Sequence, residues 1–390
     1  MYLQLIKKGL LLPFVLILSG WLAGSAQENY KTVSTADSTK IYKGGAFYEV
    51  ARYDRQSIRK KKPENVILMI GDGMGIAQVY AGMTANGGNL FLQNFKHVGW
   101  AKTHSSDNYI TDSAAGGTAL ASGTKTYNGA IGVDPAGNSV RNIRELAEEM
   151  GKATGVVSTS AITHATPASF VAHVPKRSTY EDIAAGFLKT NIDVFIGGGY
   201  KHFHDRKDGR DLVRELKSKG YQVLSNIDSI AAVRSGKLAG LTAPEHNARY
   251  SERGNMLEKA TKTALNILSR DKDGFFLMVE GSQIDWGGHQ NNMSYLVGEM
   301  LDFDRTVGIA LAFAASNKET LIVVTADHET GGLSIKEGNL STGMVRGAFS
   351  GGSHTGIVVP VLAFGPGAEQ FTGFMENTDI AEKIRKLMKK

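Results

Sequence analysis

Short apolar runs recur along the chain, and each is followed by glycine or polar residues. The six clearest runs are VILMI (66–70), GVV (155–157), DVFI (193–196), FFLMV (275–279), LIVV (321–324) and VLAF (361–364). Apolar runs of this length that end in turn residues are typical of buried β-strands. We therefore expect one strand in each run.

Segments with apolar residues at helical spacing lie between several of these runs. They are NIRELAEEMGK (142–152), DLVRELKSKG (211–220), NMLEKATKTALNILSR (255–270) and SYLVGEMLDFDRTVGIALAFAAS (294–316). The two shorter segments have a glycine near or at the end, as helices often do. Strands that alternate with helices predict an α/β fold, in which helices flank both faces of a central, mostly parallel sheet.

The first 26 residues follow a different pattern. Lys7 and Lys8 precede the apolar segment GLLLPFVLILSGWLAG, which leads to the small residues Ser25 and Ala26. A basic start, a short apolar segment and small residues before a cleavage site are typical of a secretory signal peptide. The sequence thus predicts a signal peptide over residues 1–26. It also predicts a periplasmic or secreted protein with no membrane attachment after cleavage.

The rest of the chain divides by composition. Residues 27–63 suggest a poorly packed leader, in which RQSIRKKK (55–62) fits a solvated linker better than a polyanion site. From residue 64 to 390 the pattern predicts one α/β domain, which carries the chemistry described below. Residues 200–254 are irregular and rich in charge, so we expect a small insertion with accessory elements at about this position.

Composition limits the classes of function. The 390 residues are 42% hydrophobic and 21% charged, which suits a soluble globular protein with a large core. The formal net charge of +6 is a mild bias for this length and does not indicate nucleic-acid binding. Cysteine is absent, so an exported form would be stabilised by its core and by metals, not by disulfides.

Carboxylates and imidazoles gather where three of the expected strands end. They are Asp72 after VILMI, Glu280, Asp285 and His289 after FFLMV, and Asp327 and His328 after LIVV. Each of them alone also fits a structural role, such as a turn residue or a surface histidine. However, ligands bind at the carboxyl ends of strands in open parallel sheets. Because three strands deliver such groups to one edge, the sequence predicts a zinc or magnesium site there.

Two alternative chemistries fit the sequence less well. The turn GDGMG could begin a dinucleotide-binding motif, but Ile76 stands where its third glycine should fall, and residues 74–106 contain no Asp or Glu to bind a ribose. Ser113 lies in TDSAA, not in the G-x-S-x-G of a nucleophile elbow. A third chemistry fits better, in which Ser113 starts the small-residue helix in ITDSAAGGTALASG (110–123). The helix N-terminus could hold a phosphate there while a metal-activated Ser113 attacks it.

Six sequence blocks occur in the order found in alkaline phosphatases. They are GDGMG, TDSAAGGTALASGTKTYNGAIGVD, THATPASFVAHV, EGSQIDWGGH, TADHETGG and GGSHTG. The chain therefore resembles the alkaline phosphatase family from about Asn65 to the C-terminal region, and in GSQIDWGGH it most resembles the marine bacterial branch. The resemblance implies a large α/β sandwich. It also implies metal-dependent hydrolysis of phosphate monoesters through a phosphoserine, which releases inorganic phosphate and an alcohol.

The resemblance also implies a role for each site residue. Ser113 is the expected nucleophile, and Arg177 is expected to bind the phosphate oxygens. The expected cofactors are two Zn²⁺ and one Mg²⁺. One zinc would be held by Asp285, His289 and His354, the second by Asp72, Asp327 and His328, and the magnesium by Asp72, Thr166 and Glu280.

Two positions depart from the best-known enterobacterial pattern of the family. His164 stands in place of an aspartate near the magnesium, and Trp286 in place of a lysine near the phosphate, so we expect both to affect phosphate binding.

His202 and His204 form an H-x-H pair in the expected insertion. The pair fits a solvated loop and also fits a metal site, and the sequence leaves both interpretations open.

The expected partners are small phosphate monoesters, and a homodimer is a candidate assembly. A phosphodiesterase or sulfatase of the same superfamily and a non-catalytic phosphate- or metal-binding protein are the alternatives. The absence of cysteine argues against a cysteine-derived sulfatase nucleophile, and the presence of every expected ligand argues against a non-catalytic protein.

Overall fold

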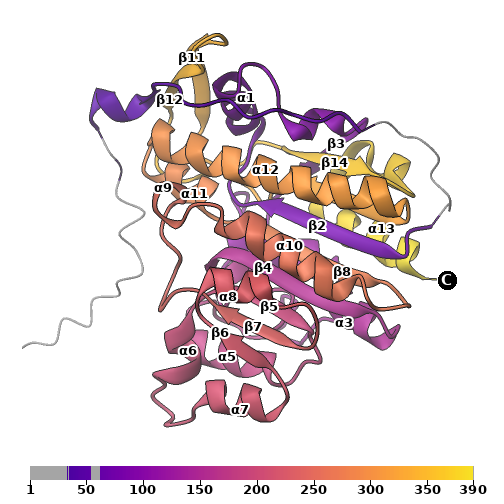
Figure 1. Cartoon of the computed structure of the whole chain (residues 1–390). Coiled ribbons are helices and arrows are strands. Elements are labelled where there is room, and N and C mark those ends of the chain that lie inside the picture. The colour runs from indigo at the N-terminus through magenta and orange to yellow at the C-terminus, as the bar shows by residue number, and fades with distance from the viewer. Residues whose placement is uncertain (1–32, 34, 54–61, 390) are drawn as a thin grey trace, which may run out of the picture.

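The computed structural model describes residues 33, 35–53 and 62–389 (Figure 1). The signal peptide predicted over residues 1–26 lies outside the described residues. Within the described part, no helix is both long and apolar enough to cross a membrane. A large sheet forms the centre of the molecule and helices flank it, so the α/β fold expected from the alternating pattern is confirmed.

The central sheet has ten strands within the described residues, and all six expected strands belong to it. In spatial order they are β15 (Gly373–Glu376), β3 (His97–Lys102), β14 (Val359–Phe364), β9 (Thr320–Thr325), β2 (Asn65–Gly71), β8 (Phe275–Gly281), β4 (Ala153–Ala161), β5 (Val194–Gly198), β7 (Leu238–Leu241) and β6 (Gln222–Leu224). Neighbouring strands are parallel except at β14, which is antiparallel to both β3 and β9. The sheet is therefore mostly parallel, as the sequence predicts.

Strands β2, β4, β8 and β9 lie in the middle of the sheet, and every residue in them is buried. A strand that is covered on both faces needs apolar residues at successive positions, not only at alternate ones. For example, the ring of Phe276 on β8 stacks on Phe170 at a centroid distance of 6.0 Å. The continuous runs VILMI and FFLMV are apolar for this reason.

Two long helices cover one face of the sheet. Helices α10 (Met256–Leu268) and α12 (Met293–Asn317) lie side by side and contact the central strands, and α1 (Ile76–Ala85) packs on α12 (Figure 1). The expected helices over 255–270 and 294–316 are thus confirmed. Their apolar stripes are buried against the strands, which is where most of the stability of such helices arises.

A second layer of helices includes the one that begins at Ser113. Helix α2 (Ser113–Ser122) packs against α3 (Ile143–Glu149), α4 (Ala165–Ala168) and α13 (Asn377–Met388), and α3 contacts β4 and β8. The expected helix over 142–152 corresponds to α3. The remaining short elements near these layers are α5 (Tyr180–Phe187) and the 3₁₀ helices η2 (Asp37–Lys40), η3 (Phe91–Asn94) and η4 (Ala368–Phe371).

The described part of residues 27–63, for which composition suggested a poorly packed leader, contacts the domain at several points although most of its residues are exposed. Strand β1 (Ile41–Tyr42) pairs with β12 (Met344–Phe349), which in turn pairs with β11 (Leu333–Asn339). The hydroxyl of Tyr48 donates a 2.6 Å hydrogen bond to Asp304 on α12, 256 residues further along the chain. Partners so distant in sequence leave no local pattern in the segment itself.

The expected insertion at about residues 200–254 contributes to the main sheet as well as to the surface. Its strand β7 pairs with β5, and β6 extends the sheet beyond β7. The same segment carries α6 (Tyr200–His204), α7 (Leu212–Ser218), α8 (Ile227–Ala232) and α9 (Tyr250–Arg253). His246 follows β7 and accepts a 3.0 Å hydrogen bond from the backbone N–H of Ala161 at the end of β4. The insertion therefore reaches the edge of the sheet where the strands end.

Candidate active site

The candidate metal ligands meet at the carboxyl ends of three adjacent strands. Asp72 follows β2, Glu280 lies at the end of β8, and Asp327 and His328 follow β9; in the sheet, β2 lies between β8 and β9. Helix α11 (Gln283–His289) begins directly after β8 and carries two further candidates, Asp285 and His289. The convergence expected from the three strand ends is therefore present in the structure.

His354 reaches the same place from a different segment. It lies in β13 (His354–Thr355), which forms a short antiparallel ladder with β10 (Glu329–Thr330), so that Thr330 is paired with His354. Because β10 directly follows Asp327 and His328, this ladder places His354 beside them. The imidazole rings of His354 and His328 stack with centroids 3.5 Å apart.

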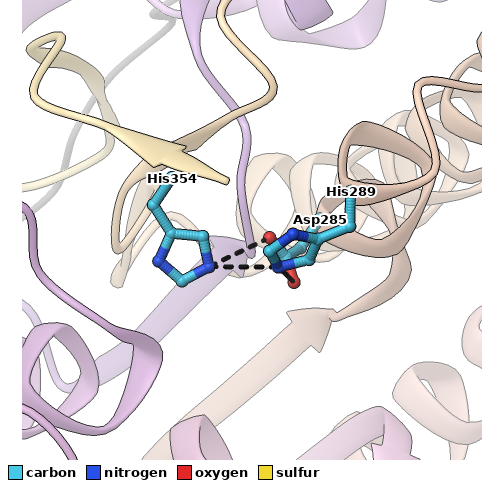
Figure 2. Close-up of side chains that lie close together, drawn as sticks. All are labelled: Asp285, His289 and His354. Carbon is cyan, nitrogen blue, oxygen red and sulfur yellow. Dashed lines mark hydrogen bonds and ion pairs between the residues drawn. The ribbon is translucent and has the colours of Figure 1, made fainter. Parts of the chain in front are cut away.

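Asp285, His289 and His354 form the first candidate metal site, in which one ligand atom from each lies within 4.8 Å of the others (Figure 2). The Nε2 atoms of the two histidines are 3.2 Å apart. Each Nδ1–H donates to a backbone carbonyl, from His289 to Gly352 at 2.7 Å and from His354 to Thr111 at 2.9 Å. A neutral imidazole has one protonated nitrogen, so both Nε2 atoms are left as acceptors that face each other. A bound cation would satisfy both acceptors, and one carboxylate with two imidazoles is a ligand set typical of zinc.

Asp72, Asp285 and His328 form a second group whose ligand atoms lie within 4.8 Å of one another, so Asp285 belongs to both groups. Asp327 lies beside it, with its Oδ2 3.3 Å from the Nε2 of His328, and that Nε2 is 3.5 Å from Oδ1 of Asp72. All these side chains are buried. The family resemblance implies that Asp72, Asp327 and His328 share a zinc, and the structure brings them together around the His328 Nε2 atom.

The carboxylates of Asp72 and the neighbouring Asp327 are too deeply buried to remain charged by themselves. Burial, together with the neighbouring carboxylates, raises the pKa of Asp72 well above its ordinary value and that of Asp327 to about 8. Both oxygens of Asp72 and the Oδ2 of Asp327 accept no hydrogen bond from the described residues. Burial also lowers the pKa of His328 well below its ordinary value, which keeps its ring neutral. Clustered acceptors and a neutral imidazole suit bound cations.

Glu280 lies in a buried cluster of hydroxyl groups. Its Oε2 accepts 2.6 Å hydrogen bonds from Ser158 and Ser282, while its Oε1 accepts none with standard geometry from the described residues. Burial raises the pKa of Glu280, while the hydrogen bonds from Ser158 and Ser282 and the nearby hydroxyl of Thr166 on α4 oppose that rise. Hydroxyl and carboxylate oxygens are the ligands that Mg²⁺ prefers. Glu280, Thr166 and the nearby Asp72 thus provide the donor set expected for magnesium.

Ser113 is the first residue of α2, and Asp112 caps the helix by accepting a 3.0 Å hydrogen bond from the N–H of Ala115. The Oγ of Ser113 lies 3.3 Å from the Nε2 of His328, so the hydroxyl faces the second group. A side chain at Gly116 would place its Cβ 3.0 Å from the Cβ of Asp327. Small residues in this helix therefore allow it to lie directly against the ligands.

Arg177 lies beside Ser113 at the entrance of the site. Its guanidinium donates a 2.9 Å hydrogen bond to Asp112 and lies 3.3 Å from the Nε2 of His164. Ser113, Arg177 and His164 line a cleft of about 780 Å³ together with the first metal group. A phosphate in this cleft would meet the guanidinium on one side and the N–H groups of the helix start on the other.

Trp286 is not among the described residues that line this cleft. Only 5% of its surface is exposed, and its ring packs edge to face on His246 at 4.9 Å and on His164 at 6.2 Å. Burial lowers the pKa of His246 to about 4, so this ring is neutral at ordinary pH. Trp286 therefore contacts the cleft through His164, which lies 3.3 Å from Arg177.

The H-x-H pair of the insertion makes ordinary side-chain contacts. His202 lies with its Nδ1 2.6 Å from the hydroxyl of Thr163 and stacks on Tyr180 at a centroid distance of 4.7 Å. His204 lies with its Nδ1 3.5 Å from a carboxylate oxygen of Asp211. Neither residue belongs to a group of metal-ligand geometry among the described residues.

Three residues of the site were assigned no role from the sequence. Asp112 accepts a hydrogen bond from Arg177, Thr330 donates one to Asp285, and Glu329 accepts one from Thr355, which lies in β13 next to His354. A capping position directly before Ser113 was a visible signal for Asp112, since Asp is a preferred N-cap residue. Glu329 and Thr330 had only their position next to His328 to mark them.

Comparisons with known proteins agree with this geometry. The family model described as Alkaline phosphatase matches residues 63–348. Alkaline phosphatase 4 of Bacillus subtilis (strain 168) is 34% identical over 90% of this chain and 94% of its own length. The alkaline phosphatase of Escherichia coli (strain K12) is 32% identical over 84% of this chain and 86% of its own length.

Solved structures extend the agreement to the fold. The alkaline phosphatase from the Antarctic bacterium TAB5 is 43% identical, with a TM-score of 0.79 over 84% of this chain and 98% of its own. A His 135 Asp mutant of that enzyme has Mg bound in its M3 site. The cold-active alkaline phosphatase of a Shewanella species is 31% identical, with a TM-score of 0.77 over 84% of this chain and all of its own. This chain belongs to the alkaline phosphatase family.

Proposed function

We propose that this enzyme hydrolyses phosphate monoesters through a covalent phosphoserine at Ser113. The observation that carries the proposal is the position of the Ser113 hydroxyl. It starts α2, lies 3.3 Å from His328, and lines the same cleft as Arg177 and the first metal group. A nucleophile, a guanidinium and a helix N-terminus thus face one space that a phosphate group fits.

The reaction has two in-line steps. The Oγ of Ser113 attacks phosphorus, and a phosphorus–oxygen bond to serine forms as the bond to the alcohol oxygen breaks. Water then attacks the phosphoserine, the bond to Oγ breaks, and inorganic phosphate leaves. During both steps Arg177 binds the phosphate oxygens bidentately, while Asp112 keeps the guanidinium in place. The alcohol takes up one proton, and the serine hydroxyl is regenerated.

Two Zn²⁺ and one Mg²⁺ are the cofactors we propose. Asp285, His289 and His354 would hold one zinc, Asp72, Asp327 and His328 the second, and Asp72, Thr166 and Glu280 the magnesium. The facing Nε2 atoms and the unbonded oxygens of Asp72, Asp327 and Glu280 support these assignments. When bound, these ions would supply positive charge that lowers the pKa of the serine hydroxyl and stabilises the leaving oxygen.

The substrates we propose are small phosphate monoesters, and the location is the periplasm or the exterior of the cell. The location rests on the signal-peptide pattern of residues 1–26. A homodimer remains a candidate assembly.

Hydrolysis of p-nitrophenyl phosphate between pH 7 and 11 tests the proposal. The wild type should be active and lose that activity with a chelator, and Ser113→Ala should lose most of it without chelator. Ser122→Ala is the matched control, because Ser122 ends the same helix and its hydroxyl bonds to the backbone of Thr118 and Thr124. Wild-type activity in Ser113→Ala would overturn the proposal.

A further inference from the structure

Glu329 is a buried carboxylate next to the site, and neither the metal assignments nor the two reaction steps use it. Only 2% of its surface is exposed. Its Oε1 accepts hydrogen bonds from Nε2 of Gln78 at 2.6 Å and from the N–H of Leu333 at 3.1 Å. Its Oε2 accepts from the hydroxyl of Thr355 and from the N–H of Gly332 at 3.1 Å. Four neutral donors thus surround one carboxylate.

These donors come from segments that each carry proposed zinc ligands. Gln78 lies on α1, which follows Asp72 after one tight turn. Thr355 directly follows His354, and Glu329 itself directly follows His328. The β10–β13 ladder adds a backbone connection, since it pairs Glu329 with Thr355 and Thr330 with His354. Glu329 is therefore bonded to all three segments at once.

The surrounding chain is fitted closely to this side chain. A Cβ added at Gly75, in the turn after Asp72, would collide with the side chain of Glu329. On the other side, the hydroxyl of Thr330 donates to Asp285, and its Oγ1 lies 3.3 Å from Nδ1 of His328. A shift of Glu329 would thus be passed to ligands of both proposed zinc sites.

The number of donors explains why a carboxylate stands here. A carboxylate offers about four acceptor positions on two oxygens, whereas an amide offers acceptors on one oxygen and donors on its nitrogen. Glutamine at 329 would therefore turn two of the four bonds into donor–donor contacts. Partners around metal ligands typically change metal affinity by roughly 10–100-fold when they are removed.

We infer that Glu329 is a positioning residue that sets the spacing of His354, His328 and the Asp72 turn for zinc binding. The inference rests on the proposed function, because it takes the two zinc sites as given. It predicts that weakening the Glu329 bonds lowers the affinity for zinc even though no ligand is changed.

Substitutions at Thr355 test the inference with the smallest change. Thr355→Val removes the hydroxyl that bonds to Glu329 and keeps the shape, and Thr355→Ser keeps the hydroxyl. Zinc affinity is measured by competition with a chromophoric chelator on the full chain, together with the melting temperature with and without zinc. We expect zinc to bind roughly tenfold more weakly to Thr355→Val, while Thr355→Ser stays within about twofold of the wild type.

Glu329→Gln should have a larger effect than Thr355→Val. Glu337→Gln is its matched control, because Glu337 lies on the nearby strand β11 with 60% of its side chain exposed, and it should leave zinc affinity unchanged. If Glu329→Gln does not fold, the two Thr355 variants still decide the question.

The rise in melting temperature on adding zinc separates positioning from a purely structural role. Positioning reduces that rise, whereas a structural role lowers the melting temperature of the zinc-free protein and leaves the rise unchanged. An unchanged rise, or wild-type zinc affinity in Thr355→Val, overturns the inference. If the wild type itself binds no zinc, the proposed function fails instead, so the two failures are distinguishable.

Discussion

Arg177 donates a 2.9 Å hydrogen bond from its guanidinium to the carboxylate of Asp112, the residue that caps α2 directly before Ser113. Asp112 also accepts a 3.0 Å hydrogen bond from the N–H of Gly129. Burial raises the pKa of Asp112, but Arg177 and the N–H groups of Ala115 and Gly129 lower it by more, so the carboxylate stays charged. The group that is to bind phosphate is thus fixed to the same helix end as the nucleophile.

Asp112→Asn should weaken phosphate binding while it keeps an oxygen to cap the helix. The neutral amide holds the guanidinium less firmly, so we expect the inhibition constant of inorganic phosphate to rise roughly fivefold, equivalent to about 1 kcal/mol. Inhibition of p-nitrophenyl phosphate hydrolysis measures it. Asp134→Asn is the control, because Asp134 lies in an exposed turn. An unchanged constant in Asp112→Asn would refute the role given to the Arg177–Asp112 pair.

His164→Asp combined with Trp286→Lys should tighten inhibition by inorganic phosphate. The two unit charges of an ammonium and a phosphate attract by ~4 kcal/mol at ~4 Å and an effective dielectric of ~20, and by less through a water. The native indole has no such charge, so we expect the native enzyme to release phosphate readily. The double variant should bind phosphate more tightly and turn over more slowly wherever release limits the rate.

The alternative explanation is that Trp286 acts only by packing on His164 and His246. In that case the ammonium introduced by Trp286→Lys does not tighten phosphate binding. Phosphate binding that is unchanged or weaker in the double variant, with the two single variants measured beside it, would favour that explanation over ours.

Much of the fold could be predicted because it depends on local pattern. Central strands such as β2 and β8 are continuous apolar runs, and the groups that follow them reach one sheet edge by topology alone. The direction of β14 could not be predicted in this way. The run VLAF is largely buried, as the neighbouring strand β9 is, yet β14 is antiparallel to both β9 and β3, and burial does not encode direction.

The site residues to which the sequence assigned no role depend on contacts between distant segments. Glu329 accepts a hydrogen bond from Gln78, which lies 251 residues away, so no local pattern marks this contact. Asp112 is different, because a carboxylate at the N-cap before Ser113 was visible in the sequence. Its hydrogen bond with Arg177, which lies 65 residues further along the chain, was not visible in the sequence.

Removal of metal should abolish activity and lower thermal stability. The buried carboxylates Asp72, Asp327 and Glu280 have raised pKa values without a cation. The loss of metal therefore removes the positive charge that would compensate these buried negative charges. A ligand at 100 times its Kd stabilises the folded state by about 2.7 kcal/mol per site. Activity and melting temperature are measured after dialysis against a chelator and again after zinc and magnesium are added back. Full activity in a sample that elemental analysis shows to be free of metal would refute the metal assignments.

His173 and Glu145 should stabilise the fold in a defined pH range. Their hydrogen bond is 2.8 Å long; it raises the pKa of His173 above 6.5, while His173 and the N–H of Asn142, opposed by burial, lower that of Glu145 below 4.5. The contribution of charged His173 to the free energy of unfolding is fully present below pH 6.5 and is lost as the pH rises through its raised pKa. The glutamate contribution is present above pH 4.5 and is lost as the pH falls.

The difference in stability between the wild type and His173→Gln should therefore be greatest at pH 5–6 and small at pH 9. Chelator-treated samples keep metal loss out of the comparison. Urea unfolding of both proteins at these pH values measures the difference. A difference that is equal at pH 5.5 and pH 9 would show that His173 contributes packing and not charge.

Trapping the phosphoenzyme tests the role of Ser113 most directly. The wild type is mixed with a phosphate monoester that carries labelled phosphorus and is quenched in acid, and the labelled residue is located by peptide mapping. The structure places the Ser113 hydroxyl at the helix end that faces Arg177 and His328, so the account predicts label on Ser113 and none in Ser113→Ala. Label on another residue, or wild-type turnover by Ser113→Ala, would contradict it.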